Sequence, residues 1–137
     1  MDARRIDVFF YGLFMDKETL EDKGVRPVDI RSAAVPGFAL RIGAQAALTP
    51  ALSGRVHGLL MKLSHADLDR LYAEPTMRAY RPEPVLALLH NGTSIAALCY
   101  NLPQAPARDE RNAEYAAKLH SLTQRLGLPS DYVASIL

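Results

Sequence analysis

The chain lacks several features that would point to common protein classes. Its 137 residues include one cysteine, Cys99, so no internal disulfide can form, and the apolar segment AALCY predicts a buried rather than a reactive thiol. A formal net charge of +1 argues against nucleic-acid binding, because phosphate affinity needs a concentrated cationic face. No segment approaches the roughly 20 consecutive apolar residues of a membrane helix, so we expect no membrane partner.

The usual motifs of metal, nucleotide and nucleophile sites are missing too. The histidines are scattered, without an HExxH pattern or paired cysteines; they are His57, His65, His90 and His120. No glycine-rich nucleotide loop occurs, and Ser53 lacks the two flanking glycines of a nucleophile elbow. We therefore predict no metal site and no cofactor.

Length and composition predict one globular domain over residues 1–137. Apolar residues make up 49% and charged residues 23%, which is ordinary for a folded chain with a single core. The start MDARRIDVFFYG has an acid at position 2 and only a short apolar stretch, unlike a signal peptide. A cytoplasmic location is the default expectation, and surplus apolar surface at Phe9, Phe38 or the C-terminal helix could support a homodimer.

Hydrophobic patterning predicts an α+β fold. The predicted strands are residues 6–12, 33–43, 53–63 and two arms within 84–102, joined at Asn91-Gly92 by a type I′ turn. The predicted helices are 17–23, 64–74 with Ser64 as N-cap, a longer one that carries Tyr115, Leu119, Leu122 and Leu126 on one face, and 131–137. This order indicates a mixed sheet or small barrel with helices packed outside it.

Gly12 lies in FFYGLFM, where the first strand must turn sharply toward a helix. Such a turn exposes consecutive backbone N–H groups, which suit a carboxylate or a developing oxyanion. A plain tight turn explains the same glycine equally simply. The residues alone leave both interpretations open.

Glu74 ends the predicted central helix, and Pro75 directs it out of the helical region. A carboxylate gains nothing from the negative end of a helix dipole, so stability alone does not explain this acid. Shielding by Leu71, Met77 and Tyr80 would suit it to proton transfer, and the prolines at 75, 82 and 84 would stiffen its loop. A solvent-exposed loop acid is the alternative.

Several segments, in order, resemble the γ-glutamylcyclotransferase-like (avirulence-induced-gene-type) family. They are YGLFM, VHGLLMKLSHADLDRLYAEPTMRAYRPEPV and ALCYNL, and the end LGLPSDYVASIL is similar to the tails of bacterial members. The resemblance spans nearly the whole chain. It implies a small mixed β-barrel with flanking helices, and an enzyme that cyclises a small-molecule γ-glutamyl amine to 5-oxoproline without a cofactor and releases the amine.

The resemblance also assigns residues. Glu74 takes the catalytic acid/base position. The implied substrate-binding residues are Tyr11, Gly12, Leu13, Phe14, Tyr80 and Tyr100. Leu13 and Phe14 stand where small polar residues often follow the YG pair, so the identity of the substrate and the retention of catalysis stay open. The residues do not identify the released amine either. A non-catalytic module that binds a small metabolite, or an interaction protein with a surface glutamate, are the alternatives.

Overall fold

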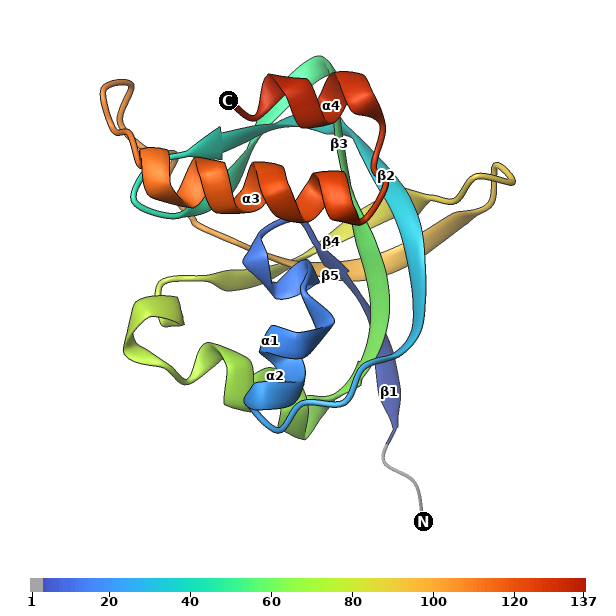
Figure 1. Ribbon diagram of the computed structural model, residues 1–137. Helices are drawn as coiled ribbons and strands as arrows, with labels where there is room; N and C mark the ends of the chain where they lie inside the picture. Colours follow the sequence, from blue (N-terminus) through green and yellow to red (C-terminus); the bar gives the residue numbers. More distant parts are fainter. Residues whose placement is uncertain (1–3) are drawn as a thin grey trace.

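The computed structural model describes residues 4–137, in which five strands close into a barrel and helices pack outside it (Figure 1). The strands are β1 (Arg5–Phe10), β2 (Val28–Ile42), β3 (Ala46–Ser64), β4 (Arg81–Leu88) and β5 (Ser94–Asn101). The helices are α1 (Lys17–Asp22), α2 (His65–Tyr72), α3 (Ala113–Arg125) and α4 (Ser130–Ser135), with 3-10 turns η1 (Leu13–Met15) and η2 (Pro75–Met77). The predicted α+β barrel with flanking helices is confirmed.

The second half of β1 is buried on both faces, and it forms the unbroken apolar run VFFY together with Tyr11, which follows the strand. The barrel order is β1-β3-β2-β4-β5, antiparallel throughout except where β5 meets β1 in parallel. Val8 and Phe10 pack outward with helix residues such as Leu119, whereas Phe9 and Tyr11 pack inward with residues of the other strands. The expectation that Phe9 could offer surface to a homodimer is therefore wrong, because its side chain fills the barrel interior. Alternate side chains thus serve two separate cores, which is the pattern expected of a fully covered strand.

The barrel interior also contains the single cysteine. Cys99 on β5 is fully buried among apolar strand residues. Burial, assisted by the nearby carboxylate of Glu83, raises the pKa of the Cys99 thiol to about 12. The thiol stays protonated near neutral pH, as expected of a cysteine that packs rather than reacts.

The ends of the α2 helix agree only partly with the sequence patterns. The Ser64 hydroxyl accepts a hydrogen bond from the Asp67 N–H at 3.2 Å, which confirms the predicted N-cap. The helix ends at Tyr72, two residues before the predicted end, and Glu74 is extended with φ −62° and ψ 141°. Pro75 explains this extended backbone, because its ring disfavours helical conformation at the preceding residue.

Two predictions about strands are wrong in detail. Pro82 and Pro84 lie within β4 and not in the loop that holds Glu74. Strands β2 and β3 are longer than the predicted 33–43 and 53–63, because their ladder continues through two register shifts that the sequence pattern presents as breaks.

The hairpin between β4 and β5 is confirmed, but its predicted type I′ turn is wrong. Among the described residues, only Asp29 and four glycines have positive φ, so Asn91 is not left-handed and Gly92 alone in this turn is, at φ 85°. Gly92 N–H donates to Leu89 O at 3.0 Å and Leu89 N–H donates to Thr93 O at 2.9 Å. This is a three-residue loop with the glycine at a bulge, the next most common hairpin solution.

Candidate active site

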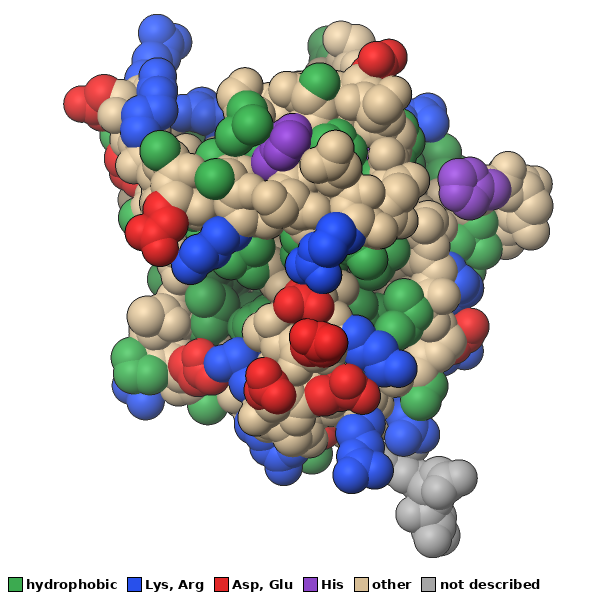
Figure 2. All heavy atoms as spheres, in the orientation of Figure 1, with side chains coloured by type: hydrophobic (Ala, Val, Ile, Leu, Met, Phe, Trp, Pro, Cys, Tyr) green, Lys and Arg blue, Asp and Glu red, His purple; other side chains and the backbone are tan. Residues whose placement is uncertain are grey.

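A cavity of about 330 Å³ lies where the end of β1 meets η1, α3 and the α2–η2 segment. Figure 2 shows hydrophobic side chains set back in a hollow below α3, with acidic and basic side chains around its margin. All seven residues that the family resemblance assigned to the site line this one cavity; they are Tyr11, Gly12, Leu13, Phe14, Glu74, Tyr80 and Tyr100. Residues up to 89 positions apart in the chain are therefore brought together, while their individual roles stay predictions.

Gly12 is required here by close packing rather than by backbone conformation. Its φ of −111° and ψ of −154° are open to any residue. A Cβ atom at this position would lie 2.7 Å from the Tyr115 hydroxyl oxygen. Contacts this short to a Cβ atom essentially never occur in real structures. The same hydroxyl accepts a weak hydrogen bond from Leu13 N–H at 3.4 Å, so α3 holds the turn in place.

The turn leaves backbone donors at the cavity. Met15 N–H donates to Gly12 O at 3.0 Å and closes η1. The N–H groups of Gly12 and Phe14 have no acceptor among residues 4–137. Two neighbouring donors beside an apolar hollow suit a carboxylate or an oxyanion, as the strand-to-helix turn had suggested.

Glu74 lies beside a basic residue that sequence reasoning missed. Its Oε1 accepts a hydrogen bond from Lys23 Nζ at 2.5 Å, across 51 positions of chain. The Glu74 side chain is 41% exposed and that of Lys23 29%. Shielding of the carboxyl is therefore weaker than predicted: Met77 and Tyr80 line the cavity with it, but Leu71 belongs to the core between barrel and helices.

The cavity wall is rich in tyrosine. Five of the six tyrosines in the sequence line it, namely Tyr11, Tyr72, Tyr80, Tyr100 and Tyr115. Burial raises the pKa of all five hydroxyls, so they are neutral phenols at physiological pH. The rings of Tyr72 and Tyr100 stack with centroids 3.9 Å apart and planes 9° apart.

Two of the predicted substrate-binding tyrosines already use their hydroxyl groups. Tyr11 donates to Tyr100 O at 2.9 Å, and Tyr80 donates to Ala46 O at 2.5 Å. Each ring therefore forms part of the wall, while its hydroxyl group anchors one element to another. Only a ligand that displaces these carbonyls could use the two hydroxyls as donors.

Asn101 supports this wall from behind and was not anticipated. Its side chain is buried, accepts from Leu48 N–H at 2.8 Å, and donates to Leu48 O and Glu83 Oε1, both at 2.9 Å. Asn101 thereby ties the end of β5 to β3 next to Tyr11. The polar residue at the end of the apolar segment ALCYN was the available signal.

The described residues form neither a cluster of metal ligands nor a helix suited to a membrane. Within residues 4–137, no three His, Cys, Asp or Glu side chains gather closely enough to hold a metal ion. None of the helices over the same range combines the length and the apolar character needed to cross a membrane.

Comparison with known families decides which family this chain belongs to. A family model described as gamma-glutamyl cyclotransferase, AIG2-like, matches residues 8–119. The chain belongs to this family. The match begins in β1 and ends in α3, so it includes Glu74 and every predicted site residue. No curated protein matches the chain in sequence.

Solved structures show the same fold at low sequence identity. A solved structure with the name gamma-glutamyl cyclotransferase aligns with a TM-score of 0.78 and 16% identity, over 97% of this chain and 86% of that one. YkqA from Bacillus subtilis aligns with a TM-score of 0.79 and 20% identity, over 98% of this chain but 53% of that one. An AIG2-like protein from Mus musculus aligns with a TM-score of 0.58 and 15% identity, over 82% and 91%.

Proposed function

We propose that this protein cyclises a γ-glutamyl amine to 5-oxoproline and releases the amine, with Glu74 as general acid/base. The observation that carries the proposal is the position of the Glu74 carboxylate beside the Gly12 turn, in one cavity with free backbone donors. Membership of the gamma-glutamyl cyclotransferase, AIG2-like family supports the same reaction. A cytoplasmic location remains part of the proposal.

The reaction needs little beyond conformation, proton transfer and charge stabilisation. The α-amine of the substrate attacks its own γ-carbonyl carbon, a C–N bond closes the five-membered ring, and the original amide C–N bond breaks. Glu74 takes a proton from the attacking nitrogen and returns it to the departing one. Because nucleophile and carbonyl belong to one molecule, the cavity contributes chiefly by holding the folded-back conformer.

The turn supplies the charge stabilisation in this scheme. The N–H groups of Gly12 and Phe14 face no acceptor of the described chain and can receive the oxyanion that develops on the γ-carbonyl oxygen. The hydrophobic side chains of Leu13 and Phe14 do not interfere, because the donors are backbone groups.

A second candidate is a module that binds the same class of metabolite without turnover. The Lys23–Glu74 contact favours it, because an ion pair at 2.5 Å holds the carboxylate that would have to act as base. Leu13 and Phe14 favour it as well, since they offer no side-chain hydrogen bonds to a substrate.

Release of 5-oxoproline from a panel of γ-glutamyl amines distinguishes the two candidates. We expect Glu74→Gln to lose about 10²- to 10⁴-fold in kcat, the usual contribution of one general acid/base, with its melting temperature nearly unchanged. Glu21→Gln, an exposed acid on α1 outside the cavity, is the matched control and should behave as wild type. Full activity in Glu74→Gln would refute the role of Glu74, and ligand binding without release would establish the binding module.

A further inference from the structure

The site cavity contains one positive and one negative side chain. Among the described residues that line it, Lys23 is the only basic one and Glu74 the only acidic one, and the other walls are apolar, aromatic or uncharged. The two charges lie in direct contact, with Nζ and Oε1 2.5 Å apart. A ligand that enters this cavity therefore meets a matched pair of opposite charges rather than a field of one sign.

We propose that the Lys23–Glu74 pair recognises the zwitterionic α-amino-acid head group of the substrate by exchanging partners. The Lys23 ammonium leaves Glu74 for the α-carboxylate of the substrate, and the freed Glu74 carboxylate receives the α-ammonium. This inference rests on the proposed function and makes Lys23 the specificity-determining residue for a free α-carboxylate.

Electrostatics favours the exchange if Glu74 is the base. The substrate nitrogen arrives as an ammonium and must reach Glu74 to give up its proton. A second ammonium, that of Lys23, occupies that carboxylate and repels the incoming charge. The α-carboxylate, one carbon away from the α-nitrogen, offers Lys23 a new partner of the right sign. Two ion pairs thus replace one, and neither protein charge is left unpaired.

The position of Lys23 allows the movement. Its backbone is fixed at the end of α1, where Lys23 N–H donates to Leu20 O at 3.0 Å and Gly24 N–H donates to Glu21 O at 2.9 Å. The side chain beyond this anchor is a flexible four-carbon stem and is 29% exposed. Because the pair is partly hydrated, breaking it costs little, as is typical of exposed ion pairs.

The exchange also gives the α-carboxylate and the oxyanion different binding groups, because the turn could not bind both. If Lys23 binds the α-carboxylate, the N–H groups of Gly12 and Phe14 remain for the oxyanion of the γ-carbonyl. Each charged or polarised atom of the substrate then has one partner. No charged side chain of the cavity is left for the amine that is released.

A pair of substrates that differ only in the α-carboxylate tests this assignment. One is a γ-glutamyl amide, and the other is the 4-aminobutanoyl amide of the same amine, which lacks the carboxylate and would cyclise to 2-pyrrolidinone. For Lys23→Met we expect KM for the γ-glutamyl amide to rise about 10- to 100-fold, the value of one charge-assisted hydrogen bond, with kcat within a few-fold. KM for the carboxylate-free amide should not rise and should fall somewhat, because Lys23→Met frees Glu74 for the ammonium of a substrate that offers Lys23 no partner. Lys23→Arg should restore most of the difference between the two substrates.

The control is Lys17→Met, an exposed lysine on the same helix that does not line the cavity, which should change neither substrate. Equal effects of Lys23→Met on both amides, or no effect on either, would overturn the role of Lys23 while leaving the cyclisation intact. If wild type binds without turnover, calorimetric affinities for the two amides give the same comparison. If wild type neither binds nor cyclises γ-glutamyl amides, the proposed function itself fails, and this inference with it.

Discussion

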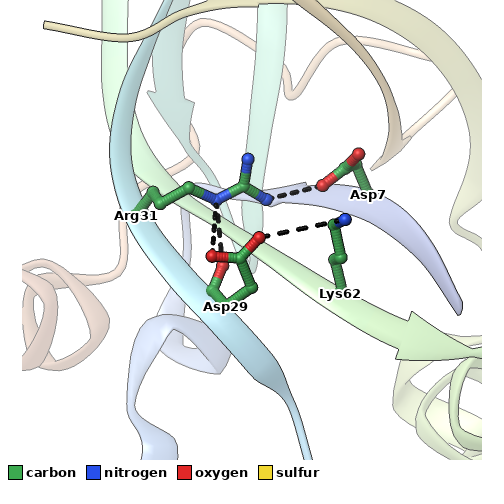
Figure 3. Close-up of polar contacts among 4 residues, drawn as sticks. All are labelled: Asp7, Asp29, Arg31 and Lys62. Atoms are coloured by element: carbon green, nitrogen blue, oxygen red, sulfur yellow. Dashed lines mark hydrogen bonds and ion pairs between the residues drawn. The ribbon is translucent and has the colours of Figure 1, made fainter.

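Two ion pairs of nearly equal length occupy different surroundings in this molecule. Lys23 and Glu74 meet at 2.5 Å beside the cavity, and Arg31 and Asp7 meet at 2.6 Å on the barrel wall (Figure 3). Their exposures are also similar, at 29% and 41% for the first pair and 23% for each member of the second. Distance and burial alone therefore do not distinguish the pair at the candidate site from the pair on the barrel wall.

The neighbours make the difference. Arg31 Nε also donates to Asp29 O at 3.0 Å, and the Asp29 carboxylate lies 3.6 Å from Arg31 and 3.9 Å from Lys62. Figure 3 shows these charges turned toward one another across neighbouring strands. The barrel-wall network thus satisfies itself, whereas the cavity pair has aromatic walls and empty space beside it. Only a pair next to open space can change partners when a ligand arrives.

Filling the space next to Gly12 should give the largest effect. This effect should be confined to the cavity. Gly12→Ala places a methyl group 2.7 Å from the Tyr115 hydroxyl oxygen, so the turn, the Tyr115 side chain or α3 must shift. We expect kcat/KM, or ligand affinity, to fall about 100-fold, because displacements of about 1 Å cost this much in positioned sites. Steady-state kinetics or calorimetry with a γ-glutamyl amide measures it.

A second substitution shows whether the hydroxyl is the cause. Tyr115→Phe removes the colliding oxygen, so Gly12→Ala/Tyr115→Phe should recover much of the loss. Gly92→Ala, at φ 85° in the distant hairpin, is the control and should lower stability without changing KM. An equal loss in the single and double variants would show that the methyl group harms the turn for another reason.

Removing a charge from the barrel-wall network should lower stability and leave the cavity unaffected. We expect this effect to be of intermediate size. Arg31→Met leaves the half-buried Asp7 carboxylate without its partner and releases Asp29 as well. We expect the free energy of unfolding to fall by about 1–3 kcal/mol, the range for an unsatisfied polar group, with KM and kcat unchanged. Urea denaturation and steady-state kinetics on the same preparation test both halves. A changed KM would mean that the barrel-wall network also serves the site.

The sequence predictions that succeeded depend on interactions between residues close together in the chain. The Ser64 cap, the apolar first strand and the extended Glu74 before Pro75 each depend on residues adjacent in the chain. The site residues were assigned by family resemblance. They line one cavity, because β1 and the α2–η2 segment end beside it, while their roles stay predictions.

Long-range geometry accounts for what the sequence could not predict. Lys23 reaches Glu74 across 51 residues, and no pattern at the end of a short helix announces such a partner. Tyr115 was predicted for the packed face of α3, but its hydroxyl group determines the space around Gly12. The turn at Asn91-Gly92 differed for a local reason, since Thr93 N–H donates to the Asn91 side chain at 2.9 Å and only the glycine needs positive φ.

The smallest expected effect concerns the stability contributed by the cavity pair itself. A double-mutant cycle with Lys23→Met and Glu74→Gln should give a coupling energy of about 0.2–1 kcal/mol for unfolding, as for other partly exposed pairs. The same cycle with Arg31→Met and Asp7→Asn should give a larger value, because Asp29 also holds the Arg31 side chain in place. Urea denaturation at low and high salt measures both, and salt should weaken the cavity pair more. If the cavity pair proved the stronger of the two, Lys23 would be fixed in place by stability, and the exchange of partners would cost more than a substrate head group can return.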